Sequence, residues 1–284
     1  MNDDDHGNQG GKTTRGWQFV SYVVVLLFLL WVLVPILTVV FNSFKPVTAI
    51  FTRTPTLWFE PTLAHYSGVW AKGTFPHQIL NSAIVATGTT ILSLLIGTPA
   101  AYALSRIKFR GSGFWFRVFL FARMVPAVAL VVPMFVLLQV TGLKNTYLGL
   151  MLTHTSFALP LVVWMMHSFF SELPHELEEA AIVDGAGRFQ AFLLVALPLV
   201  LPGLAVTAVL TVFFSWNEFL FALVLTGPAT QTVPIGVSAF IGTVSVDWGG
   251  SSAAAVIAMI PMFVIGLGIQ RFLVRGLAMG AVKG

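Results

Sequence analysis

One carboxylate stands inside a long apolar stretch, where a charged group is costly. Glu218 lies in FFSWNEFLFAL, residues 213–223, and is the only charged residue of that stretch. At the centre of a bilayer a charge costs roughly 2.5–3.5 kcal/mol on insertion scales, and it is retained where it has a partner or a wet cavity. Counted from Pro202 at about 1.5 Å per residue, Glu218 is about 24 Å along a helix, toward its far half. Two interpretations stay open: a near-interface carboxylate that pins two helices together, or one that faces a path through the protein.

Few other side chains are candidates for chemistry. His154 and His167 are thirteen residues apart, so we expect buried or pore-lining polar histidines rather than two ligands of one metal. Arg123 lies about two turns inside another apolar segment, where it could snorkel to the inner surface or pair with another group. A Walker P-loop, an HExxH motif and a nucleophile with its base are all absent from the sequence, and GSG at 111–113 lacks the full G-x-S-x-G pattern. We therefore expect this chain to do no covalent chemistry and to bind no ATP in the Walker manner.

Composition identifies the solvent of these side chains. Of the 284 residues, 57% are hydrophobic and 9% are charged, with a mean hydropathy of +0.88, whereas a soluble domain carries roughly 25% charged residues. The net charge is +4, but the basic residues are scattered at the ends of apolar runs, which argues against nucleic acid. The absence of cysteine excludes disulfides, Cys-ligated zinc and Cys nucleophiles. The chain is predicted to lie in a bilayer.

The elements that must position these residues are membrane helices. A spanning helix needs about 20 apolar residues, and its backbone must be hydrogen-bonded internally. The sequence predicts an all-α, polytopic membrane helix bundle of about six transmembrane helices. Residues 1–16 are expected to form a polar, disordered tail, and residues 17–284 a single membrane domain. The predicted spans are 18–41, 79–104, 117–139, 147–170, 201–224 and 252–273.

The basic residues orient the bundle. With the N-terminus in the cytoplasm, ten Lys and Arg residues fall in or beside inner segments and four fall in outer loops. Because positive charge favours the cytoplasmic side, both termini are predicted to be cytoplasmic. The loop 171–200 then faces the cytoplasm as well.

That loop contains an acidic segment, EEAAIVDGAG, residues 178–187. Acidic residues from Glu176 to Glu179 favour the positive N-terminal end of a helix, and Gly185 fits a left-handed C-cap. A second helix is expected from about Arg188 to Pro198. The sequence therefore predicts a helix, a glycine turn and a helix, which fits a passive linker as well as a docking element.

The spacing in this loop resembles that of a known family. Glu179-Ala180-Ala181 is followed by three residues, Gly185, nine residues, Val195, one residue and Leu197-Pro198. This is similar to the EAA loop of bacterial ABC-importer permeases, E-A-A, x3, G, x9, I, x, L-P, with Val195 in place of Ile. In that family the loop forms a coupling helix that seats in a cleft of the cytoplasmic ATPase subunit. The resemblance implies ATPase contacts at Glu179, Ala180, Ala181, Asp184, Gly185 and Ala186.

Other segments resemble the maltose-type sugar permeases, which have the type I ABC-importer permease fold. These are NSAIVA at 81–86, AYALSRIKFRG at 101–111, WNEF, DWGG, AAAVIAMIP, QRFLVRGL and GAVKG, so that the resemblance covers residues 17–284. It implies that the tail 274–284 reaches the ATPase dimer interface through Gly280, Lys283 and Gly284. If Asn217 and Glu218 face the permeation path, Trp216 could stack there on a sugar.

The resemblance also implies an assembly. It comprises a second homologous permease subunit, two cytoplasmic ATPase subunits and an extracytoplasmic binding protein that delivers a sugar or related polyol, all at the inner membrane of a bacterium. No cofactor is expected in this chain, since ATP and Mg would bind the ATPase subunits. The main alternative is an ion-driven secondary transporter, which would favour an inverted repeat and several membrane carboxylates, whereas Glu218 is the one candidate here. A polytopic membrane enzyme is disfavoured because the catalytic motifs are absent.

Overall fold

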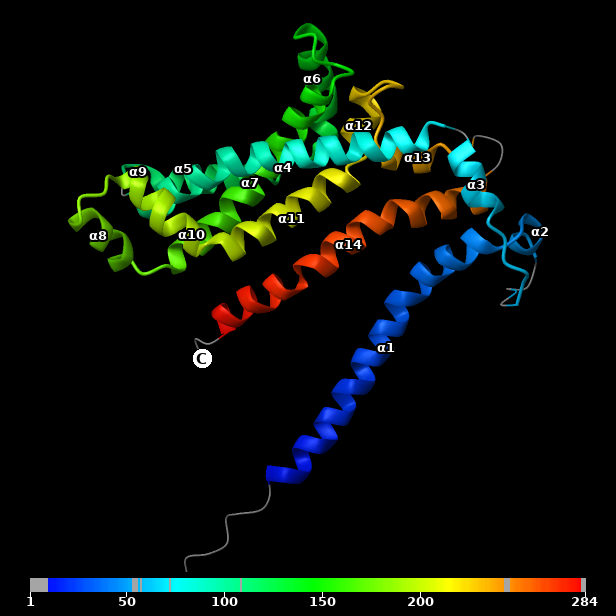
Figure 1. Ribbon diagram of the computed structural model, residues 1–284, viewed down its shortest axis with the longest axis horizontal. Helices are drawn as coiled ribbons and strands as arrows, with labels where there is room; N and C mark the ends of the chain where they lie inside the picture. The colour runs from blue at the N-terminus through cyan, green and yellow to red at the C-terminus, as the bar shows by residue number, and fades with distance from the viewer. Residues whose placement is uncertain are drawn as a thin grey trace, which may run out of the picture.

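The computed structural model describes residues 10–52, 56, 58–71, 73–107, 109–242 and 246–281, and side chains between residues 16 and 270. These residues are largely helical, and their one β-type pairing is an isolated bridge between Ile241 and Val246. The fold is therefore all-α, as the sequence predicts (Figure 1). In chain order the helices are α1 (Gly10–Phe44), α2 (Val47–Ile50), α3 (Ala64–Ala71), α4 (Phe75–Arg106), α5 (Ser112–Ala122), α6 (Ala127–Val140), α7 (Tyr147–Glu172), α8 (Glu176–Val183), α9 (Arg188–Ala191), the π-helix η1 (Phe192–Ala196), α10 (Leu197–Leu199), α11 (Leu201–Asn217), α12 (Leu220–Leu225), α13 (Val233–Ser238) and α14 (Trp248–Ala281).

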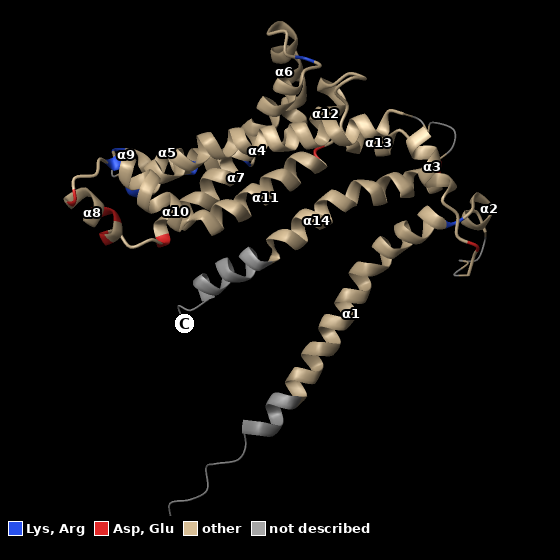
Figure 2. Cartoon of the chain, in the orientation of Figure 1, with Lys and Arg blue, Asp and Glu red and all other residues tan. Residues whose placement is uncertain are grey.

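Four helices are long and apolar enough to cross a membrane, namely α1, α4, α7 and α14. Two bent pairs raise the possible number in the described residues to six, which is the predicted number of spans. Figure 2 shows charged residues gathered near the ends of the bundle, around α8 and α9 and beside α2, while the lengths of the helices are mostly uncharged. This distribution suits a bundle whose middle lies in hydrocarbon.

The third predicted span, 117–139, is not one straight helix. It consists of α5 and α6, which meet at an angle of 94° between residues 122 and 127. Proline lacks a backbone N–H and disfavours helical backbone in the residue before it, so Pro126 accounts for the break. The predicted span is therefore broken into two helices at this proline.

The fifth predicted span, 201–224, is also interrupted. Helix α11 ends at Asn217, and α12 begins only at Leu220. The preceding segment from Arg188 to Leu199 meets α11 at 77°. The predicted second helix of the acidic loop thus exists from Arg188 onward, but it includes the π-helical turn η1 and is set at an angle to the span.

Helices α4, α7 and α11 form the packed core of the bundle (Figure 1). Glycines permit the close approach: a Cβ at Gly97 of α4 would lie 2.6 Å from a methyl of Val162, and one at Gly203 of α11 would lie 2.5 Å from the Phe169 ring. Small residues serve this purpose in membrane bundles, because lipid supplies no hydrophobic force between helices. Buried hydroxyls are satisfied along the helices, as where Thr211 Oγ1 donates to the Thr207 carbonyl at 2.8 Å.

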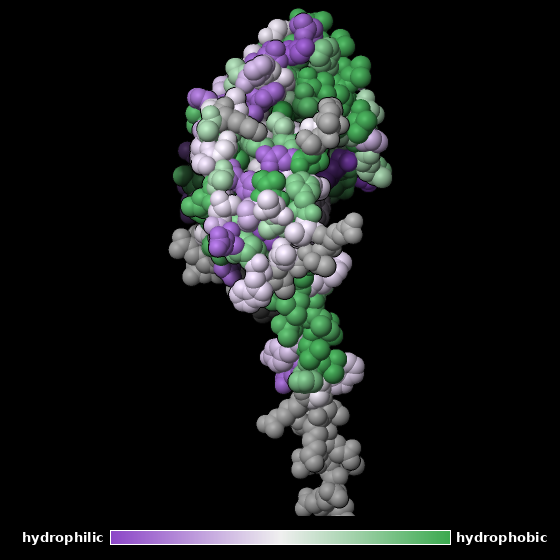
Figure 3. Space-filling model, turned by 90° about the vertical axis from the view of Figure 1, so that its right-hand side faces the viewer, coloured by the Kyte–Doolittle hydropathy of each residue, from purple (hydrophilic) through white to green (hydrophobic). Residues whose placement is uncertain are grey.

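Helix α1 differs from the rest. None of the most apolar window of its span is buried, and Figure 1 shows it diverging from the bundle except near its C-terminal end. There the Ser43 and Tyr66 hydroxyls lie 2.8 Å apart and join α1 to α3. Figure 3 views the molecule from the end that carries α2 and α3, where hydrophilic and hydrophobic residues are mixed, with the hydrophobic stem of α1 below. A helix that is apolar all round suits lipid or another membrane chain.

The segment after α12 folds back against α4. Asn81 Nδ2 donates to the carbonyls of Ala229 at 3.0 Å and Gln231 at 2.8 Å. The Val233 N–H donates to Ser82 Oγ at 2.8 Å. Side chains of α4 therefore satisfy backbone groups of a non-helical segment, which has no helical hydrogen bonds of its own.

Packing at Gly97 can be tested with a matched pair of valine substitutions. Gly97→Val should reduce the free energy of unfolding by about 1–3 kcal/mol, the usual cost of overpacking, because the new side chain meets Val162. Gly268→Val is the control, since a Cβ there would meet no heavy atom within 4 Å. Thermal unfolding of the purified chain in detergent micelles measures the difference. Equal melting temperatures for the two variants would contradict the close packing of α4 on α7.

Candidate coupling and permeation sites

The acidic loop has the conformation that its sequence predicts. Helix α8 ends in a Schellman motif: the Ala186 N–H donates to the Ala181 carbonyl at 2.9 Å, and the Gly185 N–H donates to the Ile182 carbonyl at 3.1 Å. Gly185 has φ +93°, the left-handed region that side chains disfavour. The prediction of a helix stopped by a left-handed glycine is confirmed.

The residues of the EAA pattern lie on the surface of this element. Glu179, Ala180 and Asp184 are exposed, while Ala181 and Ala186 are half-buried. Large apolar side chains are exposed beside them, since Val183 is 85% and Phe189 71% accessible. Figure 2 shows α8 with its acidic residues projecting at one end of the bundle. A partner could reach both charge and apolar surface here.

Glu178, to which the sequence gives no role beyond the N-terminal end of the helix, anchors α8 to α4. Its carboxylate forms an ion pair with Arg106 Nε at 2.9 Å, and the side chains of Glu178 and Arg106 are 10% and 4% exposed. The Tyr102 hydroxyl donates to the other carboxylate oxygen at 2.6 Å. Both partners lie on the last turns of α4. The charge content of the two segments was visible in the sequence, but their pairing joins residues 72 positions apart and has no local signal.

Arg106 also holds the chain that leads into α8. Its Nη2 donates to the Leu173 carbonyl at 2.7 Å, and its Nη1 lies 3.1 Å from a ring nitrogen of His175. The start of α8 is thus fixed to the C-terminal end of α4 as well as to α7. Motion of α8 would be passed directly to α4.

The Glu218 carboxylate occupies the break between α11 and α12. It accepts hydrogen bonds from the N–H groups of Phe221 at 2.9 Å and Ala222 at 3.0 Å. It also accepts from His154 Nε2 at 3.1 Å. The other ring nitrogen of His154 lies 2.8 Å from the Ser215 hydroxyl. This is the helix-pinning arrangement, in which the carboxylate ties the break to α7.

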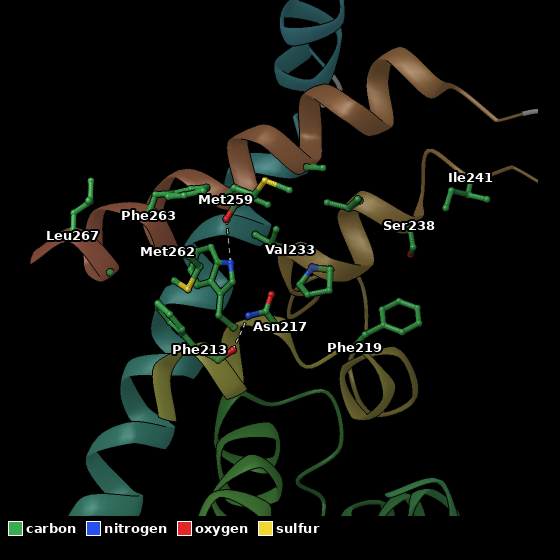
Figure 4. Close-up of a pocket in the computed structure, with 16 residues that line it drawn as sticks. Phe213, Asn217, Phe219, Val233, Ser238, Ile241, Met259, Met262, Phe263 and Leu267 are labelled. Carbon is green, nitrogen blue, oxygen red and sulfur yellow. Dashed lines mark hydrogen bonds between the residues drawn. The ribbon is translucent and has the colours of Figure 1, made fainter. Parts of the chain in front are cut away.

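Trp216 and Asn217 lie on a different side from Glu218. Both line an apolar groove of about 890 Å³ between α11, α13 and α14 (Figure 4). Trp216 is 5% exposed, and its indole N–H donates to the Ala258 carbonyl at 3.3 Å. Asn217 is exposed, and its amide donates to the Phe213 carbonyl at 2.8 Å. The structure therefore separates the three residues proposed for one solute path: Glu218 does not line this groove.

The remaining candidates fall in different places. Buried His154 belongs to the Glu218 network, whereas the His167 ring stacks on Phe116 with centroids 4.2 Å apart. Among the residues that the structure describes, no group of three or more His, Asp or Glu could hold a metal ion. Gly280 lies on α14 beyond the described side chains, and Lys283 and Gly284 lie outside the described residues.

The fold and the surface loop define the class of this protein: a polytopic α-helical membrane protein with a rigid element presented at one end for a partner. Residues 93–279 match the profile of the family described as binding-protein-dependent transport system inner membrane component. The chain belongs to this family and is a permease subunit of a transport system.

Individual relatives of this chain agree with the family assignment. The chain is 35% identical over 278 residues to the trehalose transport system permease protein SugB of Mycobacterium tuberculosis, and the match covers 97% of this chain and 100% of the relative. It is 38% identical, over 82% of it and 86% of the relative, to the trehalose/maltose transport system permease protein MalG of Thermococcus litoralis. A crystal structure of a bacterial ABC transporter involved in alginate import superposes with a TM-score of 0.78 at 22% identity, covering 93% of this chain and 99% of the other. The fold is that of an ABC-importer permease.

The Glu178 anchor is testable on the isolated chain. Glu178→Gln leaves a buried guanidinium without its charge partner, and removing one member of a buried pair costs about 3–5 kcal/mol. Thermal unfolding in micelles should show a clear loss of stability, with partial recovery in the double variant Glu178→Gln, Arg106→Gln. Glu179→Gln is the control because its side chain is exposed, and such changes stay within about 0.5 kcal/mol. Equal stabilities of the two single variants would refute the anchor.

Glu218 gives a second test. Glu218→Ala leaves two backbone N–H groups and His154 without their acceptor, at about 1–3 kcal/mol for each buried group. The Glu218→Ala chain should have a lower melting temperature than the wild type and should assemble poorly with its partner subunits. The exposed neighbour variant Asn217→Ala should have the melting temperature of the wild type. Fluorescence-detected size exclusion after heating measures both. A stable Glu218→Ala chain that fails only in transport would favour a role in the solute path instead.

Proposed function

We propose that this chain is one of two permease subunits of an ATP-driven importer of a sugar or related polyol. The observation that carries the proposal is α8, an exposed helix that is stopped by a left-handed glycine and bonded to the end of a spanning helix. Such an element can receive force from a partner and pass it to the bundle. Family membership supplies the transport class, and the relatives named for trehalose and maltose support the carbohydrate class.

In this proposal the ATPase contacts are Glu179, Ala180, Ala181, Asp184, Gly185 and Ala186. The ATPase subunits bind ATP and Mg, and this chain performs no catalysis and holds no cofactor. Gly280, Lys283 and Gly284 of the tail would add contacts at the ATPase dimer interface. A second permease subunit would complete the path, and an extracytoplasmic binding protein would deliver the solute.

The mechanism is alternating access. Closure of the ATPase dimer displaces α8, and the Arg106–Glu178 pair transmits this displacement to α4. A partner can shift the bundle only by binding its inward- and outward-facing states with different affinity. The chain therefore contributes two packings of similar energy, and ATP supplies the bias between them.

Topology and solute contacts belong to the same proposal. Both termini face the cytoplasm, in keeping with the excess of Lys and Arg on that side, and the protein lies in the inner membrane of a bacterium. Trp216 and Asn217 are better candidates for solute contact than Glu218, since they line the apolar groove between α11, α13 and α14. Glu218 does not line this groove and acts indirectly, by holding α12 in place.

Gly185 offers the test of coupling. Gly185→Val places a β-branched residue at φ +93°, where such residues are strongly disfavoured. Reconstituted complexes with this variant should hydrolyse ATP but take up substantially less solute for each ATP. Gly187→Val is the matched control, because Gly187 has φ −71° and ψ 161°, which valine adopts readily.

Uptake into proteoliposomes with ATP inside and binding protein outside measures both quantities. Normal coupling in the Gly185 variant would contradict the role of α8. Uptake that persists without the ATPase subunits would support an ion-driven transporter and overturn the proposed function as a whole.

A further inference from the structure

Arg123 lies at the 94° bend between α5 and α6. The Phe116 ring stacks on His167, and α5 and α7 run in opposite directions, so Arg123 is level with about Pro160. Both residues line one cavity. Pro160 is twelve residues from the inner end of α7, or about 18 Å at 1.5 Å per residue. In a hydrocarbon core about 30 Å thick, Arg123 lies near the middle, too deep to snorkel to the inner surface.

The described part of this chain offers Arg123 no counter-charge. Its side chain is exposed, and no hydrogen bond or ion pair joins its guanidinium to another described residue. Glu218, the carboxylate at the break between α11 and α12, is already bound to His154 and to backbone N–H groups. An unpaired charge at this depth marks a functional site by default. The counter-charge must come from beyond the residues that the structure describes.

A cavity lies beside Arg123. It has a volume of about 510 Å³ and is bounded by the bend on one side and by α7 and α11 on the other, which is within the range of small-molecule sites. Phe157 and Phe214 line it with flat apolar rings, and Ser156 contributes a hydroxyl. A guanidinium presents donors in a planar fork that matches a carboxylate, sulfonate or phosphate. The rings suit the apolar face of a sugar.

We propose that this cavity, which we call the bend site, binds an acidic carbohydrate at mid-membrane, with Arg123 holding its carboxylate, sulfonate or phosphate group. The inference rests on the proposed function and narrows its solute class to anionic sugars. Lipid phosphates lie at the membrane surface, far from this depth. A carboxylate of the second permease subunit is the competing source of charge, and the experiment distinguishes it.

The first experiment measures binding by the intact complex of permease and ATPase subunits in nanodiscs of zwitterionic lipid. Glucuronate, galacturonate and glucose 6-phosphate are compared with glucose and galactose by the rise in melting temperature that each causes. At least one acidic sugar should stabilise the complex more than its neutral counterpart. Arg123→Gln should weaken that binding by about tenfold or more, since a charge-assisted bond is lost. Arg117→Gln on the same helix is the matched control.

The second experiment restores the charge chemically. The chain contains no cysteine, so Arg123→Cys introduces a single thiol into this subunit, in a complex whose partner chains carry no reactive cysteine. Modification with aminoethyl methanethiosulfonate, which is positively charged, should recover binding of the acidic sugar. The neutral methyl reagent should not. Rescue by charge alone separates binding from a structural role.

Several results would overturn the bend site. Equal stabilisation by neutral and acidic sugars, or by none of them, would remove the anionic solute. Dissociation of the Arg123→Gln complex would assign the arginine to a partner carboxylate, and sugar binding that changes only when anionic lipid is added would assign it to lipid. ATP-driven uptake of a neutral sugar would leave the proposed function intact, whereas loss of all ATP-dependent uptake by the wild type would refute that function itself.

Discussion

A spanning segment can be interrupted only where something replaces its lost backbone hydrogen bonds, and at the end of α11 that replacement is the Glu218 carboxylate. It accepts from two N–H groups that the break exposes and from His154 on α7. No water is present in hydrocarbon to do this. The geometry beyond the break depends on it, since α12 begins at these N–H groups and the following segment then folds back onto Asn81 and Ser82 of α4. A costly charge is thus retained because it makes a non-helical turn possible.

A second carboxylate also joins two elements of the fold, at the opposite end of the core. Glu178 is ion-paired with Arg106 and accepts a hydrogen bond from Tyr102, both on α4. In the same way, Glu218 accepts a hydrogen bond from His154 on α7. Between these two ends, α4, α7 and α11 approach closely through glycines and buried hydroxyls. The exposed helix α8 and the segment after α12 are consequently attached to the same three helices. Displacement at one end can therefore be transmitted to the other through packed contacts rather than through a flexible loop.

The sequence predicted what depends on composition and local geometry. Apolar length located the membrane segments, and Gly185 predicted its own left-handed turn because only glycine adopts that backbone readily. The break at Pro126 was not predicted, since a membrane proline commonly kinks a helix without ending it. The roles of Glu178 and Glu218 depend on partners at Arg106 and His154, which are 72 and 64 positions away. Hydropathy carries no information about such pairs, so the sequence left the role of Glu218 open and gave no reason to single out Glu178.

The charges of the bundle divide by where they find their partners. Glu178 and Glu218 are satisfied inside the chain, and each holds elements of the fold together. Arg123 has no described partner in the chain, although it lies at the bend inside a predicted span. The Arg123 guanidinium therefore stays available to a group from beyond the described residues, and in the proposed transporter that group is the solute.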